Sequence, residues 1–135
     1  MTDKKQLEEG FAFTPSFDEK GLIPCITVCA QSGRVLMMAY MNAQALEKTL
    51  ETHEAHYWSR SRGALWHKGA IIGFVLKVIE LRTDCDQDCL LLRVQVVKPA
   101  DAKSVEGTCH TGRERCFYRA VDLSGDQKTL VFKDD

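Results

Sequence analysis

The sequence predicts an α+β fold, mainly an antiparallel β-sheet with few helices. Long aliphatic and β-branched runs recur along the chain, as in FVLKVIELRT and CLLLRVQVV, and such runs are typical of buried strands. Only one segment places apolar residues at helical spacing. With 135 residues, 44% of them hydrophobic, the chain has the size and composition of one folded unit with one core. We therefore expect a single domain over residues 1–135.

The first part of the chain is predicted to form a hairpin and one helix. Residues 1–20 form a polar leader with a short helical turn. Residues 21–30 and 31–41 are β-rich runs, and Ser32 with Gly33 supplies the turn between them. The segment AQALEKTLET, residues 43–52, is predicted to be a helix with Asn42 as its N-cap, because Ala45, Leu46, Thr49 and Leu50 fall at helical spacing.

The remaining elements are predicted to be strands. They are expected in HYWSRSR, in residues 74–83 and 89–97, and near the end in RCFYRAVDL and TLVF. The run KPADAKSVEGT, residues 98–108, is the one linker-like stretch, and the sequence shows no internal repeat.

Charge and cysteine usage bound the function classes. The formal net charge of −1 gives no global attraction to nucleic acid or to a membrane surface. The leader has no apolar run of signal-peptide length and no window is long enough to span a membrane, so we expect a cytoplasmic protein. In that compartment the six cysteines are better explained by metal binding or catalysis than by disulfides. Cys25 and Cys29 share one strand face and are expected to be core residues.

The segment RTDCDQDCLLLRV places three carboxylates at alternate positions. In an extended strand Asp84, Asp86 and Asp88 would point to one face, and Cys85, Gln87 and Cys89 to the other. Three neighbouring carboxylates repel one another unless water or a cation separates them, and Mg²⁺ prefers such oxygen ligands. An EF-hand loop is excluded, because its sixth and twelfth positions would be Cys89 and Gln95. A solvated acidic strand start is the alternative.

The thiols suggest a second metal. Cys109 and Cys116 flank a turn containing Gly112, so both sulfurs could meet one ion, and Cys85 could complete an open three-thiolate Zn²⁺ site. His110 adjoins a ligand and is placed to act as the general base. The alternatives are two core cysteines and an exposed histidine.

The segment HYWSRSRGALWHKG interleaves cations, hydroxyls and aromatic rings. Arginine forks and serine hydroxyls bind phosphate, and aromatic faces stack on bases, so the segment suits a phosphorylated nucleotide. An ordinary sheet edge with solvated arginines is the alternative, and this segment alone also fits single-stranded nucleic acid. The predicted substrate-binding residues are Trp58, Ser59, Arg60, Ser61, Arg62, His67 and Lys68.

The sequence resembles the phosphoribosyl-AMP cyclohydrolase family over about residues 20–120. The resemblance rests on GLIPCITV, GRVLMMAYMN, EAHYWSRSRGALWHKG, RTDCDQDCLLLRV and CHTGRERCFYR, in this order. It implies an intertwined, β-rich homodimer with Zn²⁺ at the subunit interface and Mg²⁺ nearby. Cys85 of one protomer would bind zinc together with Cys109 and Cys116 of the other. The magnesium ligands implied by the family are Asp84, Asp86 and Asp88.

The resemblance also implies a reaction and a partner. The family opens the N1–C6 bond of the adenine ring of phosphoribosyl-AMP to give a formimino carboxamide ribonucleotide, a step of histidine biosynthesis. C6 is electrophilic because N1 carries a ribosyl group, and zinc deaminases attack adenine at the same carbon. The two phosphates of this small-molecule substrate need cations, for which Arg60, Arg62 and Lys68 are expected, with Arg113 and Arg115 as further candidates. Nucleic acid and membranes are not expected partners.

Two departures from the family pattern keep other functions open. Residues 70–72, Ala-Ile-Ile, replace the polar turn that usually follows WHKG, and the 98–108 connector is longer than usual. A paralogue acting on another N-substituted nucleotide would fit the first departure. A non-catalytic zinc-binding protein is a third hypothesis, in which Cys89 would close the zinc site as a fourth ligand.

Overall fold

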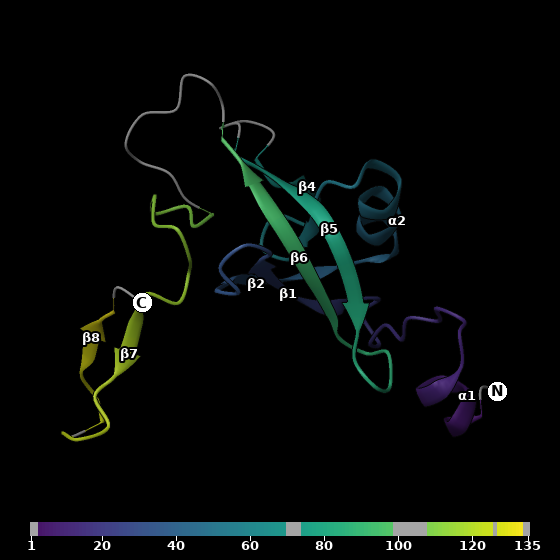
Figure 1. Cartoon of the computed structure of the whole chain (residues 1–135), viewed down its shortest axis with the longest axis horizontal. Coiled ribbons are helices and arrows are strands. Elements are labelled where there is room, and N and C mark those ends of the chain that lie inside the picture. Colours follow the sequence, from purple (N-terminus) through teal and green to yellow (C-terminus); the bar gives the residue numbers. More distant parts are fainter. Residues whose placement is uncertain (1–2, 70–73, 99–107, 126, 134–135) are drawn as a thin grey trace.

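A computed structural model describes residues 3–69, 74–98, 108–125 and 127–133 (Figure 1). Its main feature is a six-stranded sheet in the order β4-β3-β2-β1-β6-β5, in which only the β1–β6 pair is parallel. The α+β prediction, with a mostly antiparallel sheet and few helices, is confirmed. The six strands are β1 (Ile23–Cys29), β2 (Val35–Met41), β3 (His56–Ser59), β4 (Ala64–His67), β5 (Val75–Thr83) and β6 (Leu90–Val97).

The hairpin and the helix predicted for the first half are both present. Gly33 has a φ of 78° in the turn between β1 and β2, where a residue without Cβ is favoured. Helix α2 (Ala43–Thr52) begins at the predicted cap, since Asn42 Oδ1 accepts the Ala45 N–H at 2.8 Å. The leader contains a six-residue helix, α1 (Lys4–Glu9). Among the described residues no helix combines the length and apolar character needed to cross a membrane.

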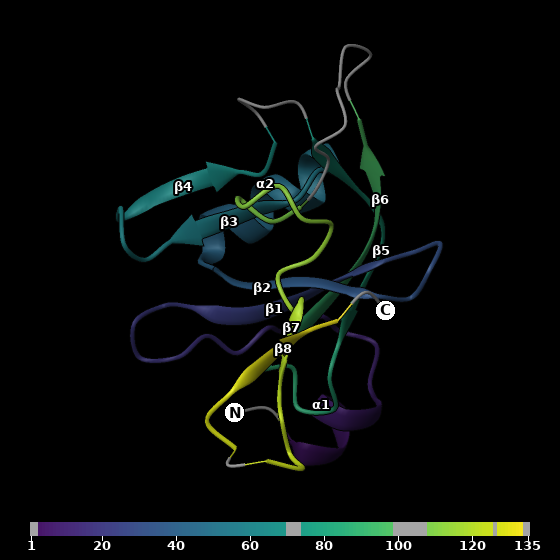
Figure 2. The same ribbon diagram turned by 90° about the vertical axis from the view of Figure 1, so that its left-hand side faces the viewer.

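The core lies on one face of the sheet, where alternate residues of β1 and β6 are buried. Leu90, Leu92 and Val94 of β6 are fully buried, and each such side chain stabilises the fold by roughly 1.5–3 kcal/mol. Helix α2 adds Ala45 and Leu46 to this core. Figure 2 shows α2 lying beside β3 and β4. The core prediction is confirmed for Cys25, which is buried, while Cys29 is half-buried and packs against the core.

The strands predicted near the end of the chain are shorter than expected. In the described part of this region, only β7 (Arg119–Val121) and β8 (Leu130–Phe132) form, and they pair with each other in a separate two-stranded sheet. The predicted strand over residues 115–123 was too long, because Cys116 instead joins β2 through its N–H, which donates to the Leu36 carbonyl at 2.7 Å. Figure 1 shows the β7–β8 hairpin standing off the large sheet.

Candidate metal and nucleotide-binding site

The segment between Thr108 and Cys116 folds into a turn that brings two thiols together. Gly112 has a φ of 92° and donates its N–H to the Cys109 carbonyl at 2.9 Å, while the Cys109 N–H donates to the Arg113 carbonyl at 3.1 Å. The turn brings the Cys109 and Cys116 thiols close enough for each to shift the pKa of the other. The predicted turn geometry is therefore confirmed, whereas the metal that the thiols would bind stays a prediction.

The two thiols differ in acidity. Burial opposes ionisation of Cys109, but hydrogen bonds from Thr111 and Cys116 and the positive charge of Lys68 outweigh it, so the pKa of Cys109 is lowered. Partial desolvation, followed by the negative charge of Cys109, raises the pKa of Cys116 to about 11. Without a metal, Cys109 is therefore the more acidic of the two thiols, and Cys116 holds its proton more tightly. Thiols bind zinc as thiolates and release their protons to the solvent on binding, so two neighbouring cysteines are a donor set that fits zinc.

Lys68 is buried beside this thiol pair. Its side chain is only 5% exposed, its Nζ donates to the Thr108 carbonyl, and it lies 5.1 Å from the centre of the Trp66 ring. Burial lowers the pKa of Lys68, while the negative charges of Cys116 and Cys109 oppose that shift. The lysine predicted to bind phosphate is therefore buried beside the thiols, whereas Arg60 and Arg62 are exposed, although Arg62 also lies 5.9 Å from the centre of the Trp66 ring.

The acidic segment is a loop, so the expectation of an extended strand with alternating faces over residues 84–89 is wrong. The segment closes on itself because Asp84 Oδ1 accepts the N–H groups of Asp88 and Cys89 at 3.0 and 3.1 Å. The loop still gathers the three predicted carboxylates, since one oxygen from each of Asp84, Asp86 and Asp88 lies within 4.8 Å of the others. These oxygens could hold a cation.

Mutual repulsion makes this cluster sensitive to protons. When protonated, Asp88 donates to Asp86 and Asp84, and these hydrogen bonds, together with the negative charges of both neighbours, raise the pKa of Asp88 to about 6. A proton thus relieves the repulsion below that pH. A divalent cation could do the same above it.

Cys85 does not join the thiol pair within one chain. Among the described residues, the three aspartates form the only group with the spacing of a metal site, and it includes no cysteine. Cys85 is exposed in the loop between β5 and β6, and both views place this loop at the opposite end of these strands from residues 108–116 (Figures 1 and 2). Cys89 likewise stays in the loop. One chain therefore brings together two of the three predicted zinc ligands.

A basic and aromatic pocket of about 540 Å³ lies at the β3–β4 turn. Arg60, Ser61 and Arg62 occupy this turn, which divides the predicted HYWSRSR strand. The Arg60 guanidinium lies 4.2 Å from the centre of the Tyr40 ring, and Arg62 lies 5.9 Å from that of Trp66. The pocket is lined by Met38, Ala39, Tyr40, Trp58, Ser59, Arg60, Ser61 and Trp66.

The other predicted substrate residues lie apart from this pocket. His67 Nε2 is 2.7 Å from Glu54 Oε1, and its ring stacks on His56 with 4.3 Å between centres. Arg113 lies 4.2 Å from the centre of the Tyr118 ring, and Arg115 is buried, where it donates to the Lys133 carbonyl at 3.0 Å. His110 is exposed in the thiol turn. Residues 70–72 and most of the 98–108 connector lie outside the described residues.

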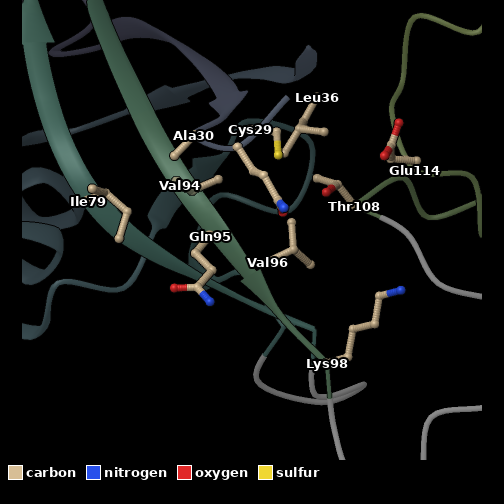
Figure 3. Close-up of a pocket in the computed structure, with 11 residues that line it drawn as sticks. Cys29, Ala30, Leu36, Ile79, Val94, Gln95, Val96, Lys98, Thr108 and Glu114 are labelled. Atoms are coloured by element: carbon tan, nitrogen blue, oxygen red, sulfur yellow. The ribbon is translucent and has the colours of Figure 1, made fainter. Parts of the chain in front are cut away.

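A second pocket, of about 670 Å³, lies between β6, the β1–β2 turn and the thiol segment (Figure 3). Cys29, Val94 and Gln95 line it on the sheet, and Thr108 and Glu114 line it on the opposite side. None of its lining residues was predicted to contact substrate. Within the described residues, Thr108 Oγ1 is the only buried side-chain oxygen or nitrogen without a hydrogen bond.

Sequence reasoning missed two residues that complete these sites. Tyr40 stacks under Arg60, and Glu54 orients His67. Tyr40 carried no local signal, because it reaches the pocket only through the pairing of β2 with β3, in which it lies opposite Trp58. Glu54 and His67 lie 13 residues apart in sequence. They meet because the β3–β4 hairpin pairs His67 with His56, which lies two residues after Glu54.

The fold and site define a class of β-rich protein with paired thiols, a buried lysine and a three-carboxylate loop. Residues 37–118 match the family model of phosphoribosyl-AMP cyclohydrolase. A phosphoribosyl-AMP cyclohydrolase of Mesorhizobium japonicum is 55% identical over 130 residues, which cover 96% of this chain and 81% of the relative. One from Brucella abortus is 52% identical over 134 residues, covering 99% and 92%. The chain belongs to the phosphoribosyl-AMP cyclohydrolase family.

Proposed function

We propose that the chain hydrolyses the N1–C6 bond of the adenine ring of phosphoribosyl-AMP, a cytoplasmic step of histidine biosynthesis. Family membership over nearly the whole chain carries this proposal. The thiol pair and the carboxylate loop give it a chemical basis, since both are donor sets for divalent cations.

We propose that zinc binds between two protomers. Cys109 and Cys116 would supply two sulfurs, and Cys85 of a second copy would supply the third, because Cys85 of the same chain does not join the pair. Three protein ligands leave a position open, as in catalytic zinc sites. Bound zinc would supply the Lewis acidity that makes water nucleophilic near neutral pH.

The β7–β8 hairpin supports a homodimer. A lone two-stranded sheet is marginally stable in water, and apolar side chains of this hairpin and its flanks are exposed. Leu123 is 77% exposed and Phe132 64% exposed. A second copy of the chain would cover these residues and bring its own acidic loop toward the thiols.

The remaining roles follow from chemistry and position. Arg60 and Arg62 would bind phosphate, Trp58 and Trp66 would contact the base, and the carboxylate loop would hold Mg²⁺ near the phosphates. His110, exposed beside Cys109, would take the proton from water as it attacks C6. The buried Lys68 ammonium would offset the negative charge that ionised thiols bring to the site.

The direct test is to mix zinc-loaded protein and Mg²⁺ with phosphoribosyl-AMP and to follow ring opening by absorbance. We expect turnover that is lost after chelation and restored by zinc. Absence of turnover with zinc bound would contradict the proposed reaction. Turnover of another N-substituted nucleotide in the same assay would instead favour the paralogue.

Replacing Arg60 by alanine is expected to raise KM about tenfold while zinc content stays unchanged. A charge-assisted hydrogen bond to phosphate contributes roughly 1.5–3 kcal/mol to binding, and Arg60 is exposed at the pocket. Steady-state kinetics measure the effect, with Lys77→Ala as the control because Lys77 is an exposed cation on β5. An unchanged KM in Arg60→Ala would remove this residue from the phosphate site.

Mg²⁺ affinity is expected to fall as the pH drops below about 6. The raised pKa of Asp88 means that the cluster binds a proton in that range, and the cation must displace it. Above this pH the carboxylates are ionised and no proton competes. Calorimetric titration at pH 5 and pH 7.5 should show weaker binding and proton release at the lower value. Equal affinities at both values would contradict a site at this cluster.

A further inference from the structure

Gln87 is a buried polar residue in the middle of the acidic loop. It is only 4% exposed, although both of its neighbours, Asp86 and Asp88, carry exposed carboxylates. Its φ of 59° lies in the left-handed region, which side chains with a Cβ adopt at a cost. The loop therefore holds an unfavourable backbone conformation and a buried amide at the same residue. Both features require compensating contacts.

The compensation comes from the N-terminal segment, more than 70 residues away in sequence. Gln87 Oε1 accepts the Thr14 N–H at 2.8 Å, and Nε2 donates to the Leu7 and Ala12 carbonyls, both at 3.2 Å. The Gln87 carbonyl also accepts the Ser16 N–H at 2.7 Å. These contacts use both donors of the amide and satisfy a carbonyl in the last turn of α1.

The same residue also helps to close the loop. Its N–H donates to the Asp84 carbonyl at 3.1 Å, so Gln87 connects the first carboxylate-bearing residue to the N-terminal segment. Three carboxylates within 4.8 Å repel one another, and a short loop would separate them unless its backbone were held. Helix α1 has six residues and buries none of them, so the hydrogen bonds to Gln87 are also contacts that hold the leader.

We propose that Gln87 is a positioning residue that makes residues 7–16 a structural part of the cation site. The side-chain amide fixes the loop from outside, and cation affinity at Asp84, Asp86 and Asp88 depends on it. This inference rests on the proposed function only in taking these carboxylates as the cation site. It assigns the leader a role that neither the fold nor the reaction requires.

The test compares variants of the full zinc-loaded chain, with Mn²⁺ as the probe because manganese takes carboxylate oxygens. Free Mn²⁺ is counted by electron paramagnetic resonance. We expect Gln87→Met, which keeps the side-chain length but loses the amide, to raise the Kd roughly tenfold, in the range for residues that orient metal ligands. Gln95→Met is the matched control, an exposed glutamine on β6. Tryptophan fluorescence from β3 and β4 reports whether the rest of the fold is intact.

Two further variants distinguish the effect of the Gln87 side chain from that of its backbone strain, and test Thr14 as its hydrogen-bond partner. Gln87→Gly relieves the left-handed strain and still loses the amide, so it should bind Mn²⁺ as weakly as Gln87→Met. Thr14→Pro removes the N–H that Gln87 Oε1 accepts. It should weaken binding alone, and it should add nothing when combined with Gln87→Met. Wild-type affinity in Gln87→Gly or Gln87→Met would overturn the proposal.

Hydrogen exchange distinguishes failure of this inference from failure of the cation site. In metal-free protein the Asp88 and Cys89 amides donate to Asp84 Oδ1, so they report loop closure directly. Faster exchange in Gln87→Met than in Gln95→Met supports positioning by Gln87, even if wild-type protein binds no Mn²⁺ and the cation site is wrong. Unchanged exchange at both amides overturns it, whatever the metal affinity and whatever the activity assay shows.

Discussion

Replacing Cys109 by serine is expected to remove bound zinc and to lower kcat/KM by more than about a hundredfold. A metal ligand contributes more than the residues around it, whose loss typically costs 10–100-fold in affinity or activity. Cys109 also has the lowered pKa of the pair, so it is the more acidic of the two sulfurs. Zinc content measured by atomic absorption and activity should fall together. Cys116→Ser should do the same, because the hydroxyl is a poor substitute for a second thiolate.

Cys89→Ser is the control that separates an open from a closed zinc site. Cys89 is half-buried in the acidic loop, where its thiol is 3.9 Å from the Leu90 carbonyl. We expect this variant to keep both zinc and activity. Loss of zinc from Cys89→Ser would show that a fourth sulfur closes the site, and would favour a zinc-binding protein without turnover. Retention of zinc in Cys109→Ser would contradict the proposed metal site itself.

The elements with strong local signals could be predicted from sequence. Helix α2 begins at Asn42 because an asparagine side chain accepts an N–H that the helix leaves free, and this preference depends on a few adjacent residues. The β1–β2 turn was predictable for the same reason, since Gly33 adopts a positive φ there. Strand order was not predicted. The parallel pairing of β1 with β6 joins segments separated by most of the chain, and no local pattern encodes it.

The acidic loop shows why a correct group of residues can follow from a wrong geometry. Alternation over residues 84–89 predicted a strand, but Asp84 accepts two N–H groups of its own loop and offers the backbone a competing hydrogen-bond pattern. The carboxylates converge because this loop turns back on itself. The burial of Gln87 was not predictable, since it depends on hydrogen bonds to leader residues more than 70 positions away in sequence.

The placement of Lys68 changes its expected role. From the sequence, Lys68 was predicted to bind a phosphate of the substrate, a role in which its loss would mainly raise KM. The structure instead buries its ammonium near two thiols, with its proton donated to the Thr108 carbonyl, directly before Cys109. Burying a cation is costly unless negative charge compensates it, and an ionised Cys109 would supply such a charge. The positive charge of Lys68 lowers the pKa of Cys109, and the negative charge of an ionised Cys109 would raise that of Lys68, so each favours the other's ionised form.

Replacing Lys68 by methionine is consequently expected to weaken zinc binding about tenfold or more and to lower kcat by a similar factor. Methionine fills a similar volume without charge, so Cys109 would lose a cation that favours its thiolate and its pKa would rise. The rate of alkylation of metal-free protein, followed against pH, reports that rise independently of activity. Lys77→Met on β5 is the matched control, because its exposed ammonium faces water and should change neither measurement. A higher KM in Lys68→Met with unchanged zinc affinity and unchanged alkylation would return this lysine to the phosphate site.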